Sequence, residues 1–214
     1  MTTNRYRADG DEAGFQPGSR RRVLANRLGI SSVRAMQHAE SEALILLMQS
    51  LIDEVDDKQR FNTRDLCDWH RRWLGAIYPW AGEYRQLNMG KGGFQFASAH
   101  LLPRLMAELD RETLSIHTPC AGMDEAQLAH ALAVTHAEFI LIHPFREGNG
   151  RLARVLNSLM ALQAGWPPLD YGGIRGRKKR EHIGAIHAAL SRNYSPMEAI
   201  FRDVLRRSER ASRS

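Results

Sequence analysis

The chain has 214 residues, 43% of them hydrophobic, and its 30 lysines and arginines exceed its 24 aspartates and glutamates to give a net charge of +6. That is enough apolar sequence for one domain with its own core. No apolar run approaches the roughly 18 residues of a membrane span, and the first thirty residues lack the apolar stretch of a secretory signal peptide, so we expect a cytoplasmic protein without a membrane span.

The positive charge is concentrated at the two ends of the chain. Residues 1–34 carry seven arginines against three acids, and residues 175–214 carry eleven basic residues against four acids, whereas the middle of the chain is net acidic. A nucleic-acid groove needs a basic surface, so we do not expect direct nucleic-acid binding by the body of the protein. We interpret the densest basic run, residues 175–180, as a solvated loop and helix start, with contact to a phosphate or another polyanion as the alternative.

The first half of the chain begins with a polar segment and continues with two helices. Residues 1–20 are polar and show no periodicity, which predicts a loose polar arm. Apolar residues recur at helical spacing over residues 32–55 and again over residues 63–78. Pro79 and Gly82 follow the second of these segments and predict that its helix ends there.

The one segment without helical spacing is residues 83–97, where apolar and polar positions alternate around a glycine-rich tip. This pattern predicts a short β-hairpin. Ser98 and Ser195 are candidate N-caps, and further helices are predicted over residues 98–116, 124–142, 150–164, 179–191 and 195–207. The sequence therefore predicts a mainly α fold with one small hairpin, a single domain over residues 21–207, and a basic tail, 208–214.

The segment best suited to chemistry lies between two of these helices. Residues 143–154 read His-Pro-Phe-Arg-Glu-Gly-Asn-Gly-Arg-Leu-Ala-Arg. Pro144 ends the preceding helix, and Gly148 and Gly150 allow successive backbone N–H groups to point into one concavity. The next helix begins here, so its unpaired N–H groups and its positive dipole end lie at the same place. The segment is suited to binding a polyphosphate.

The charged side chains of this segment agree with a polyphosphate site. Glu147 would repel phosphate unless a divalent cation lay between them, which predicts Mg²⁺ held by this carboxylate, phosphate oxygens and water. Arg151 and Arg154 lie three residues apart on the first turns of the helix, so both can reach back toward bound phosphates. His143 is the residue of the loop suited to act as a general base near neutral pH.

These twelve residues resemble the signature of the Fic family, His-x-Phe-x-Asp/Glu-Gly-Asn-Gly-Arg-x-x-Arg, at every fixed position. Upstream, Tyr-Pro-Trp-Ala-Gly-Glu-Tyr-Arg at residues 78–85 and Lys-Gly-Gly-Phe-Gln-Phe at residues 91–96 are similar to the segment that leads into the family's flap hairpin. The resemblance covers about residues 23–205. It implies a Fic-type helical bundle with a hairpin flap, so that residues 21–207 would be a Fic-like catalytic domain of the standalone, toxin-like kind.

The resemblance also implies an activity, namely transfer of AMP from ATP to a Ser, Thr or Tyr hydroxyl of a target protein with Mg²⁺. His143 would deprotonate the hydroxyl, and Glu147 would hold the metal ion. The other roles implied fall to three groups: the anion cradle of Gly148, Asn149 and Gly150, the phosphate-neutralising Arg151 and Arg154, and the target-binding flap residues Lys91, Phe94 and Phe96.

Several alternatives remain open at this point. Related death-on-curing kinases carry a lysine at the position of Gly150, so the glycine favours AMP transfer over kinase activity. Another nucleotidyl transfer, a phosphocholine transfer, or a non-catalytic nucleotide-binding regulatory module would fit the same loop. His136 lies seven residues before His143, but no HExxH or CxxC motif supports a zinc site.

Many members of the family are inhibited by a glutamate in a Ser/Thr-x-x-x-Glu-Gly/Asn motif, which pairs with the second arginine of the signature, here Arg154. The sequence contains no such motif. The resemblance therefore implies a separate, small antitoxin-like partner that supplies a glutamate to Arg154. An inhibitory helix in the C-terminal tail is the alternative.

Overall fold

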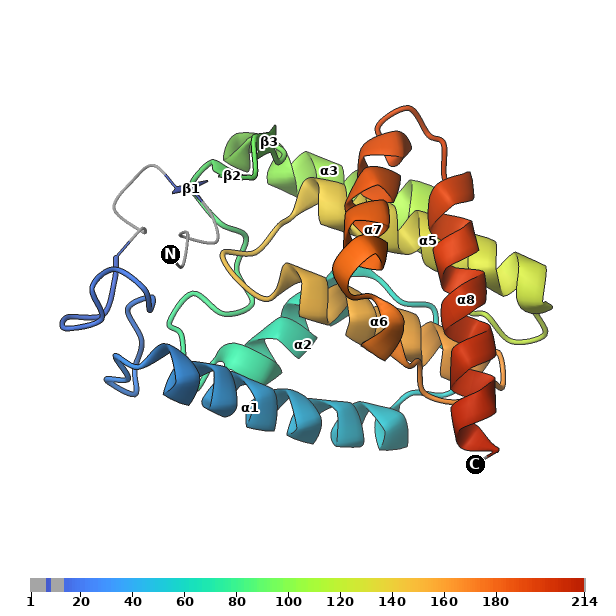
Figure 1. Cartoon of the computed structure of the whole chain (residues 1–214), viewed down its shortest axis with the longest axis horizontal. Helices are drawn as coiled ribbons and strands as arrows, with labels where there is room; N and C mark the ends of the chain where they lie inside the picture. Colours follow the sequence, from blue (N-terminus) through green and yellow to red (C-terminus); the bar gives the residue numbers. More distant parts are fainter. Residues whose placement is uncertain (1–6, 9–13, 214) are drawn as a thin grey trace. The chain divides into compact units, whose positions relative to one another are not determined.

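The computed structural model describes residues 7–8 and 14–213, and for residues 7–8 it describes the backbone alone. Helices dominate the described chain (Figure 1), and the strands are confined to one small sheet. Within the described residues, no helix is long and apolar enough to cross a membrane. The chain forms two compact units, which are described separately: a first unit of residues 1–53, 64–106 and 142–149, and a second unit of residues 54–63, 107–141 and 150–214.

Two helices form the base of the first unit. Helix α1 spans Val33–Glu54 and α2 spans Thr63–Leu74, both close to their predicted positions. Trp73 joins them, because its indole N–H donates to the backbone oxygen of Glu40 over 2.8 Å. The Tyr78 hydroxyl donates to the carboxylate of the same glutamate over 2.6 Å. Helix α2 ends four residues earlier than predicted, and the chain leaves it through turns.

The sheet of the first unit has three strands in the order β1-β2-β3, all antiparallel. The predicted hairpin is present, but its strands are only Met89–Lys91 (β2) and Phe94–Gln95 (β3). Residues 83–88 form no strand, because side chains and neighbouring segments take their hydrogen bonds: the Arg85 N–H donates to the oxygen of Pro144, for example. Strand β1, Arg7–Ala8, lies in the predicted arm and is too short to leave a periodic pattern.

Residues 14–20 of the predicted arm also have regular backbone contacts. The N–H of Gln16 donates to the oxygen of Val23 over 2.9 Å, and the N–H of Ala25 donates to the oxygen of Gly14 over 3.0 Å. Ser19 is buried in the turn between these segments. The rest of the predicted arm, residues 1–6 and 9–13, lies outside the described residues.

The predicted helix over residues 98–116 is a continuous helical run with three kinds of turn. A 3₁₀ segment, Ala99–Leu101 (η2), leads into α3, Leu102–Leu109, and a π segment, Asp110–Leu114 (η3), leads into α4, Ser115–His117. Ser98 occupies the N-cap position, as predicted, but its side chain makes no capping hydrogen bond.

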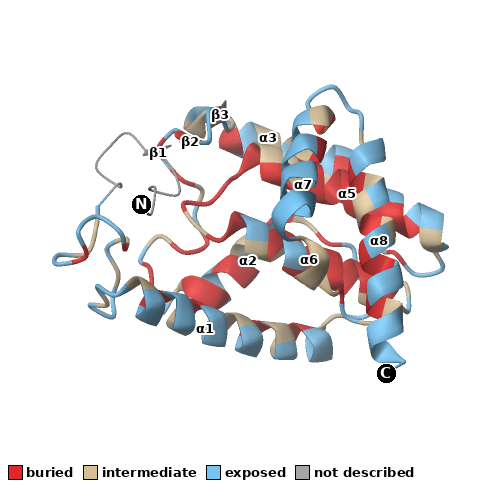
Figure 2. Cartoon of the chain, in the orientation of Figure 1, coloured by how far each residue is buried: buried red, intermediate tan, exposed pale blue. Residues whose placement is uncertain are grey.

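The second unit is built mainly on four helices. Helix α5 spans Glu125–Ile142, and α6 spans Asn149–Gln163. A 3₁₀ turn, Tyr171–Gly173 (η4), precedes the neighbouring helices α7, Gly176–Ala189, and α8, Ser195–Ser212. Buried residues line the inner faces of α5 and α6, while α7 and α8 keep long exposed faces (Figure 2).

The C-terminal helix differs from its prediction at both ends. Its N-cap is Tyr194 rather than Ser195, because the N–H groups of residues 197 and 198 donate to the backbone oxygen of Tyr194. At the other end the helix continues beyond residue 207 and includes most of the predicted basic tail, 208–214. The mainly α architecture with one small sheet confirms the predicted fold class.

Candidate functional site

The segment 143–148 forms a sharply turned loop between α5 and α6. His143 adopts a positive φ of 52°, which is uncommon for a residue other than glycine. Gly148 has a φ of +85°, and a Cβ atom at this position would lie 2.7 Å from the ring of Trp73. Glycine is therefore required at position 148, both for the backbone conformation and for the close approach of the tryptophan.

The side chain of Asn149 fastens this loop from within. It is fully buried, its Oδ1 accepts from the N–H of Phe145 over 2.9 Å, and its Nδ2 donates to the oxygen of the same residue over 2.7 Å. Both polar atoms of the amide are therefore used to close the loop. The side chain of Asn149, which the sequence predicts to be part of the anion cradle, is thus engaged within the loop.

Arg85 ties the loop to the segment around the hairpin. The guanidinium is buried and donates to the backbone oxygens of His143 over 2.8 Å, Leu87 over 2.6 Å and Ala97 over 2.6 Å. Its burial lowers the pKa to about 10, so the group keeps its charge near neutral pH. Arg85 is part of the segment 78–85 that resembles the Fic family, but the sequence alone predicts no role for it.

Phe145 is fully buried and anchors the middle of the loop. Its ring stacks on His70 with centroids 4.0 Å apart. Because the N–H of Gly82 donates to Nδ1 of His70 over 2.8 Å, Nε2 carries the proton and donates to the oxygen of Glu147 over 3.1 Å. His70 is therefore a packing residue of this loop.

The structure brings the predicted base and two of the three flap residues together. The rings of Phe96 and His143 stack with centroids 3.8 Å apart and planes 14° apart. Phe94 meets Phe96 edge-on, with centroids 5.4 Å apart. Lys91 lies exposed at the end of β2. Part of the imidazole is thus covered by the hairpin, and His143 as a whole is buried.

The phosphate-binding residues predicted from the sequence follow in the chain. The Glu147 carboxylate accepts from the N–H of Gly148 over 3.0 Å, so it faces the start of α6. Gly150 lies in the first turn of α6, and a Cβ atom there would meet nothing within 4 Å. Arg151 is half-buried and Arg154 exposed on the following turn.

The residues present fit one kind of Mg²⁺ site, in which a single protein carboxylate and the phosphates of the substrate coordinate the ion together. Among the residues that the structure describes, no group of three or more His, Cys, Asp or Glu side chains could hold a metal ion by itself. Glu147 supplies a single carboxylate beside the helix start, which matches the shared mode.

His136 is buried and belongs to a pair of histidines in the second unit. Its Nδ1 lies 3.0 Å from Oδ1 of Asn157, and its Nε2 lies 3.0 Å from Nε2 of His182. Because the Asn157 amide nitrogen donates to the oxygen of Leu132, its oxygen faces the imidazole and accepts. His136 is therefore protonated on Nδ1 and accepts from His182 on Nε2. Burial is the main cause that lowers the pKa of both rings, to about 3 and about 4.

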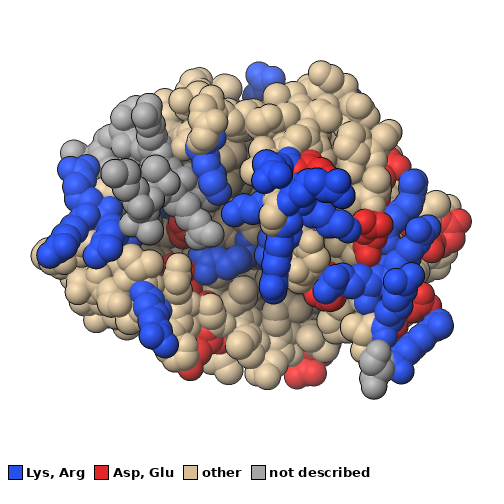
Figure 3. Space-filling model, in the orientation of Figure 1, with Lys and Arg blue, Asp and Glu red and all other residues tan. Residues whose placement is uncertain are grey.

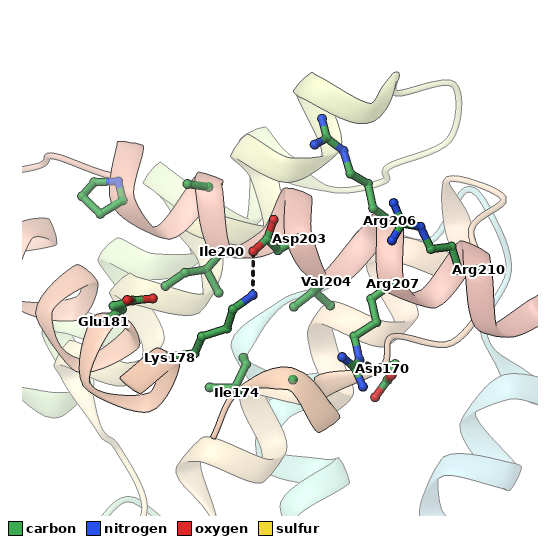
Figure 4. A pocket seen from close by; sticks show the side chains of 13 residues that line it. Asp170, Ile174, Lys178, Glu181, Ile200, Asp203, Val204, Arg206, Arg207 and Arg210 are labelled. Carbon is green, nitrogen blue, oxygen red and sulfur yellow. Dashed lines mark hydrogen bonds and ion pairs between the residues drawn. The ribbon is translucent and has the colours of Figure 1, made fainter. Parts of the chain in front are cut away.

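A pocket of about 670 Å³ lies between α7, α8 and the turn before α7 (Figure 4). Lys178 and Asp203 form an ion pair of 2.8 Å across it, and none of the predicted site residues lines it.

The predicted basic run, residues 175–180, is exposed at the start of α7, where Lys and Arg side chains gather on the surface (Figure 3). Arg177 and Lys178 pair with nearby acids, which favours the solvated interpretation of this run.

Comparison with known proteins finds a family match that includes the loop of residues 143–149. The family model described as Fic/DOC family matches residues 60–161. A protein named protein adenylyltransferase Fic from Drosophila ananassae is 29% identical over 150 residues, which cover 70% of this chain and 29% of the relative. The chain thus spans less than a third of the length of that relative.

Two solved structures show the same fold. The N-terminal Fic domain of a Bartonella effector protein from Bartonella sp. AR 15-3 aligns with a TM-score of 0.73 at 21% identity, covering 92% of this chain and 93% of that one. The BepC protein from Bartonella tribocorum with bound AMPPNP aligns with a TM-score of 0.67 at 21% identity, covering 85% and 91%. The chain is thus similar to the Fic/DOC family over residues 60–161, and it shares the fold of these Fic domains.

Proposed function

We propose that this chain is a protein adenylyltransferase that transfers AMP from ATP to a hydroxyl group of a target protein. The observation that carries the proposal is the loop of residues 143–149, in which a histidine, a carboxylate and a helix start are held in fixed positions by buried side chains. The named relative from Drosophila ananassae supports the reaction type, and the AMPPNP complex of BepC supports a nucleotide as the donor.

In this proposal the residues of the loop divide the chemistry between them. His143 takes the proton of the target hydroxyl, whose oxygen then forms a bond to the α-phosphorus of ATP. The bond between the α-phosphorus and the bridging oxygen to the β-phosphate breaks, and pyrophosphate leaves. The N–H groups at the start of α6, together with Arg151 and Arg154, stabilise the charge on the leaving phosphates.

Glu147 is the residue that would hold Mg²⁺, which when bound supplies positive charge to the phosphate oxygens. Asn149 and Arg85 contribute by keeping the loop in one conformation, so that positioning precedes substrate binding. Lys91, Phe94 and Phe96 would guide an extended segment of the target along the hairpin.

The test uses ATP labelled at either the α- or the γ-phosphate, with Mg²⁺ and a bacterial lysate. We expect label from the α-position on a discrete protein band, and its loss in His143→Ala. His100→Ala, at an exposed histidine, is the matched control and should retain the label. Label from the γ-position alone would indicate a kinase, and nucleotide binding without any transfer would indicate the non-catalytic module.

We further propose that the chain is a cytoplasmic toxin whose inhibitor is a separate small protein that places a glutamate on Arg154. The support is the missing inhibitory motif in the sequence. The purified chain should then transfer AMP without truncation. If removal of residues 208–214 were needed to release activity, inhibition by the chain's own tail would replace this proposal.

A further inference from the structure

Arg154 has a support that lies outside the family signature and outside the matched residues 60–161. The carbon of its guanidinium lies 5.1 Å from the centroid of the Tyr171 ring, within the range of a cation–π contact. The ring attracts the face of the guanidinium. Such a contact fixes the plane of the group while leaving the N–H groups at its edge available to an anion.

Tyr171 is itself held in place by a turn with several fixed contacts. Asp170 begins the turn, since one of its carboxylate oxygens accepts from the N–H of Gly172 over 2.7 Å. The other oxygen accepts from Nε of Arg207 over 2.5 Å (Figure 4). The N–H of Asp170 donates to the hydroxyl of Ser208 over 2.8 Å, and that serine is buried. The turn is thus fastened to α8 at two successive residues.

The turn also depends on a residue without a side chain. A Cβ atom at Gly172 would lie 2.8 Å from the Asp170 carboxylate, so a larger residue would disturb the hydrogen bond that closes the turn. The N–H of Ile174 closes the next step by donating to the oxygen of Tyr171 over 3.0 Å. The aromatic ring is therefore presented to α6 by a short, well-fixed segment rather than by a loose loop.

We propose that Tyr171 is a positioning residue that orients Arg154 for the terminal phosphates of the nucleotide, and that the turn fastened by Asp170, Arg207 and Ser208 is built to present its ring. This inference rests on the proposed function, because that function assigns the phosphates to Arg154. It adds to Arg154 of α6 a supporting turn at residues 170–174 and, through that turn, α8, all within the second unit.

The first test measures affinity for ATP and for AMP, which lacks the β- and γ-phosphates, by calorimetry. We expect Tyr171→Leu to weaken ATP binding by about two- to five-fold, the range of an exposed cation–π contact, and to leave AMP binding unchanged. Tyr171→Phe keeps the ring and should bind both ligands as the unchanged chain does. In the Arg154→Ala background, Tyr171→Leu should cause no further loss.

Equal weakening of ATP and AMP, or the same loss with and without Arg154, would show that Tyr171 acts only on stability and would overturn the inference. A second readout does not depend on nucleotide. The side-chain NMR signals of Arg154 should be shifted upfield by the ring in the unchanged chain and in Tyr171→Phe, and should return to ordinary values in Tyr171→Leu.

The two readouts separate this inference from the proposed function. If the NMR shift is present but Arg154→Ala leaves ATP affinity unchanged, the assignment of the phosphates to Arg154 fails, and the orienting role of Tyr171 in phosphate binding fails with it. If ATP affinity depends on Arg154 but neither the shift nor the affinity responds to Tyr171→Leu, the proposed function stands and the positioning role alone is wrong.

Discussion

Replacement of Gly148 by alanine should destabilise the protein, whereas the same change at Gly150 should not. The two glycines stand two residues apart in the same signature, but their surroundings differ. Gly148 has a φ of +85° and would place a Cβ atom 2.7 Å from the ring of Trp73, while a Cβ atom at Gly150 meets nothing within 4 Å. Each substitution adds one methyl group. Comparing them shows how much stability is lost when that methyl group meets a strained backbone and a close neighbour, as at Gly148, and not open space, as at Gly150.

The magnitude follows from two contributions. A left-handed backbone conformation costs an L-residue about 1–2 kcal/mol, and overpacking against a fixed buried side chain costs about 1–3 kcal/mol. Trp73 cannot move easily, because it is buried and its indole is hydrogen-bonded to α1. Gly148→Ala should thus lower the free energy of unfolding by about 2–5 kcal/mol, or the melting temperature by about 4–20 °C for a chain of this size.

Gly150→Ala is the matched control, and its stability should lie within about 1 kcal/mol of the unchanged chain, since alanine is the better helix former. Urea unfolding at 25 °C followed by circular dichroism measures both variants on the same scale. A Gly148→Ala variant as stable as Gly150→Ala would refute the argument, because it would mean that the loop can open away from Trp73 at no cost.

Three further outcomes are expected. Because burial lowers the pKa of His136 to about 3, the unfolded chain binds a proton at this residue below pH 6.5 and the folded chain does not. The contribution of His136 to stability is therefore lost by about 1.4 kcal/mol for each unit of acidification below pH 6.5, and His182, with its pKa lowered to about 4, adds a loss of the same sign. Urea unfolding between pH 6.5 and 4 should show this fall in stability, and His136→Gln should reduce its slope. Asn149→Asp removes the donor to the oxygen of Phe145 inside the core and should lower the free energy of unfolding by about 3 kcal/mol. The control Asn193→Asp, at an exposed acceptor, should lower it by less than about 0.5 kcal/mol. An equal loss in the two variants would contradict the role of the buried amide. Arg85→Lys cannot reach all of its backbone oxygens and should lower stability by about 3 kcal/mol or more, with faster hydrogen exchange at residues 86–97 as the specific signature and unchanged exchange as the contrary result.

The helices and the loop could be predicted because their signals are local. Periodic apolar residues place α1, and the string from His143 to Arg154 places the loop without any long-range information. The end of α2 at Leu74 could not be predicted from the sequence. Pro79 and Gly82 indicate that the helix has ended by that point, but they do not show that it ends several residues earlier.

The residues that hold the site together were missed because their partners are distant in sequence. Arg85 binds oxygens at residues 142–143, and His70 packs on Phe145, so neither has a local pattern that shows its role. Tyr171 contacts Arg154 across a segment of loop and turn. Each is an ordinary residue in its own neighbourhood. Only the fold shows which main-chain or charged group it meets.

Arg85 has a consequence for how this sequence can vary. Its guanidinium donates hydrogen bonds to main-chain oxygens, at His143, Leu87, Ala97 and Ile142. Main-chain oxygens are present whatever side chain occupies those positions. In a saturation mutagenesis screen that reads stability, the link between the hairpin segment and the signature loop should therefore survive many substitutions at Ala97, the accepting position that is neither buried nor part of the signature, and almost none at Arg85.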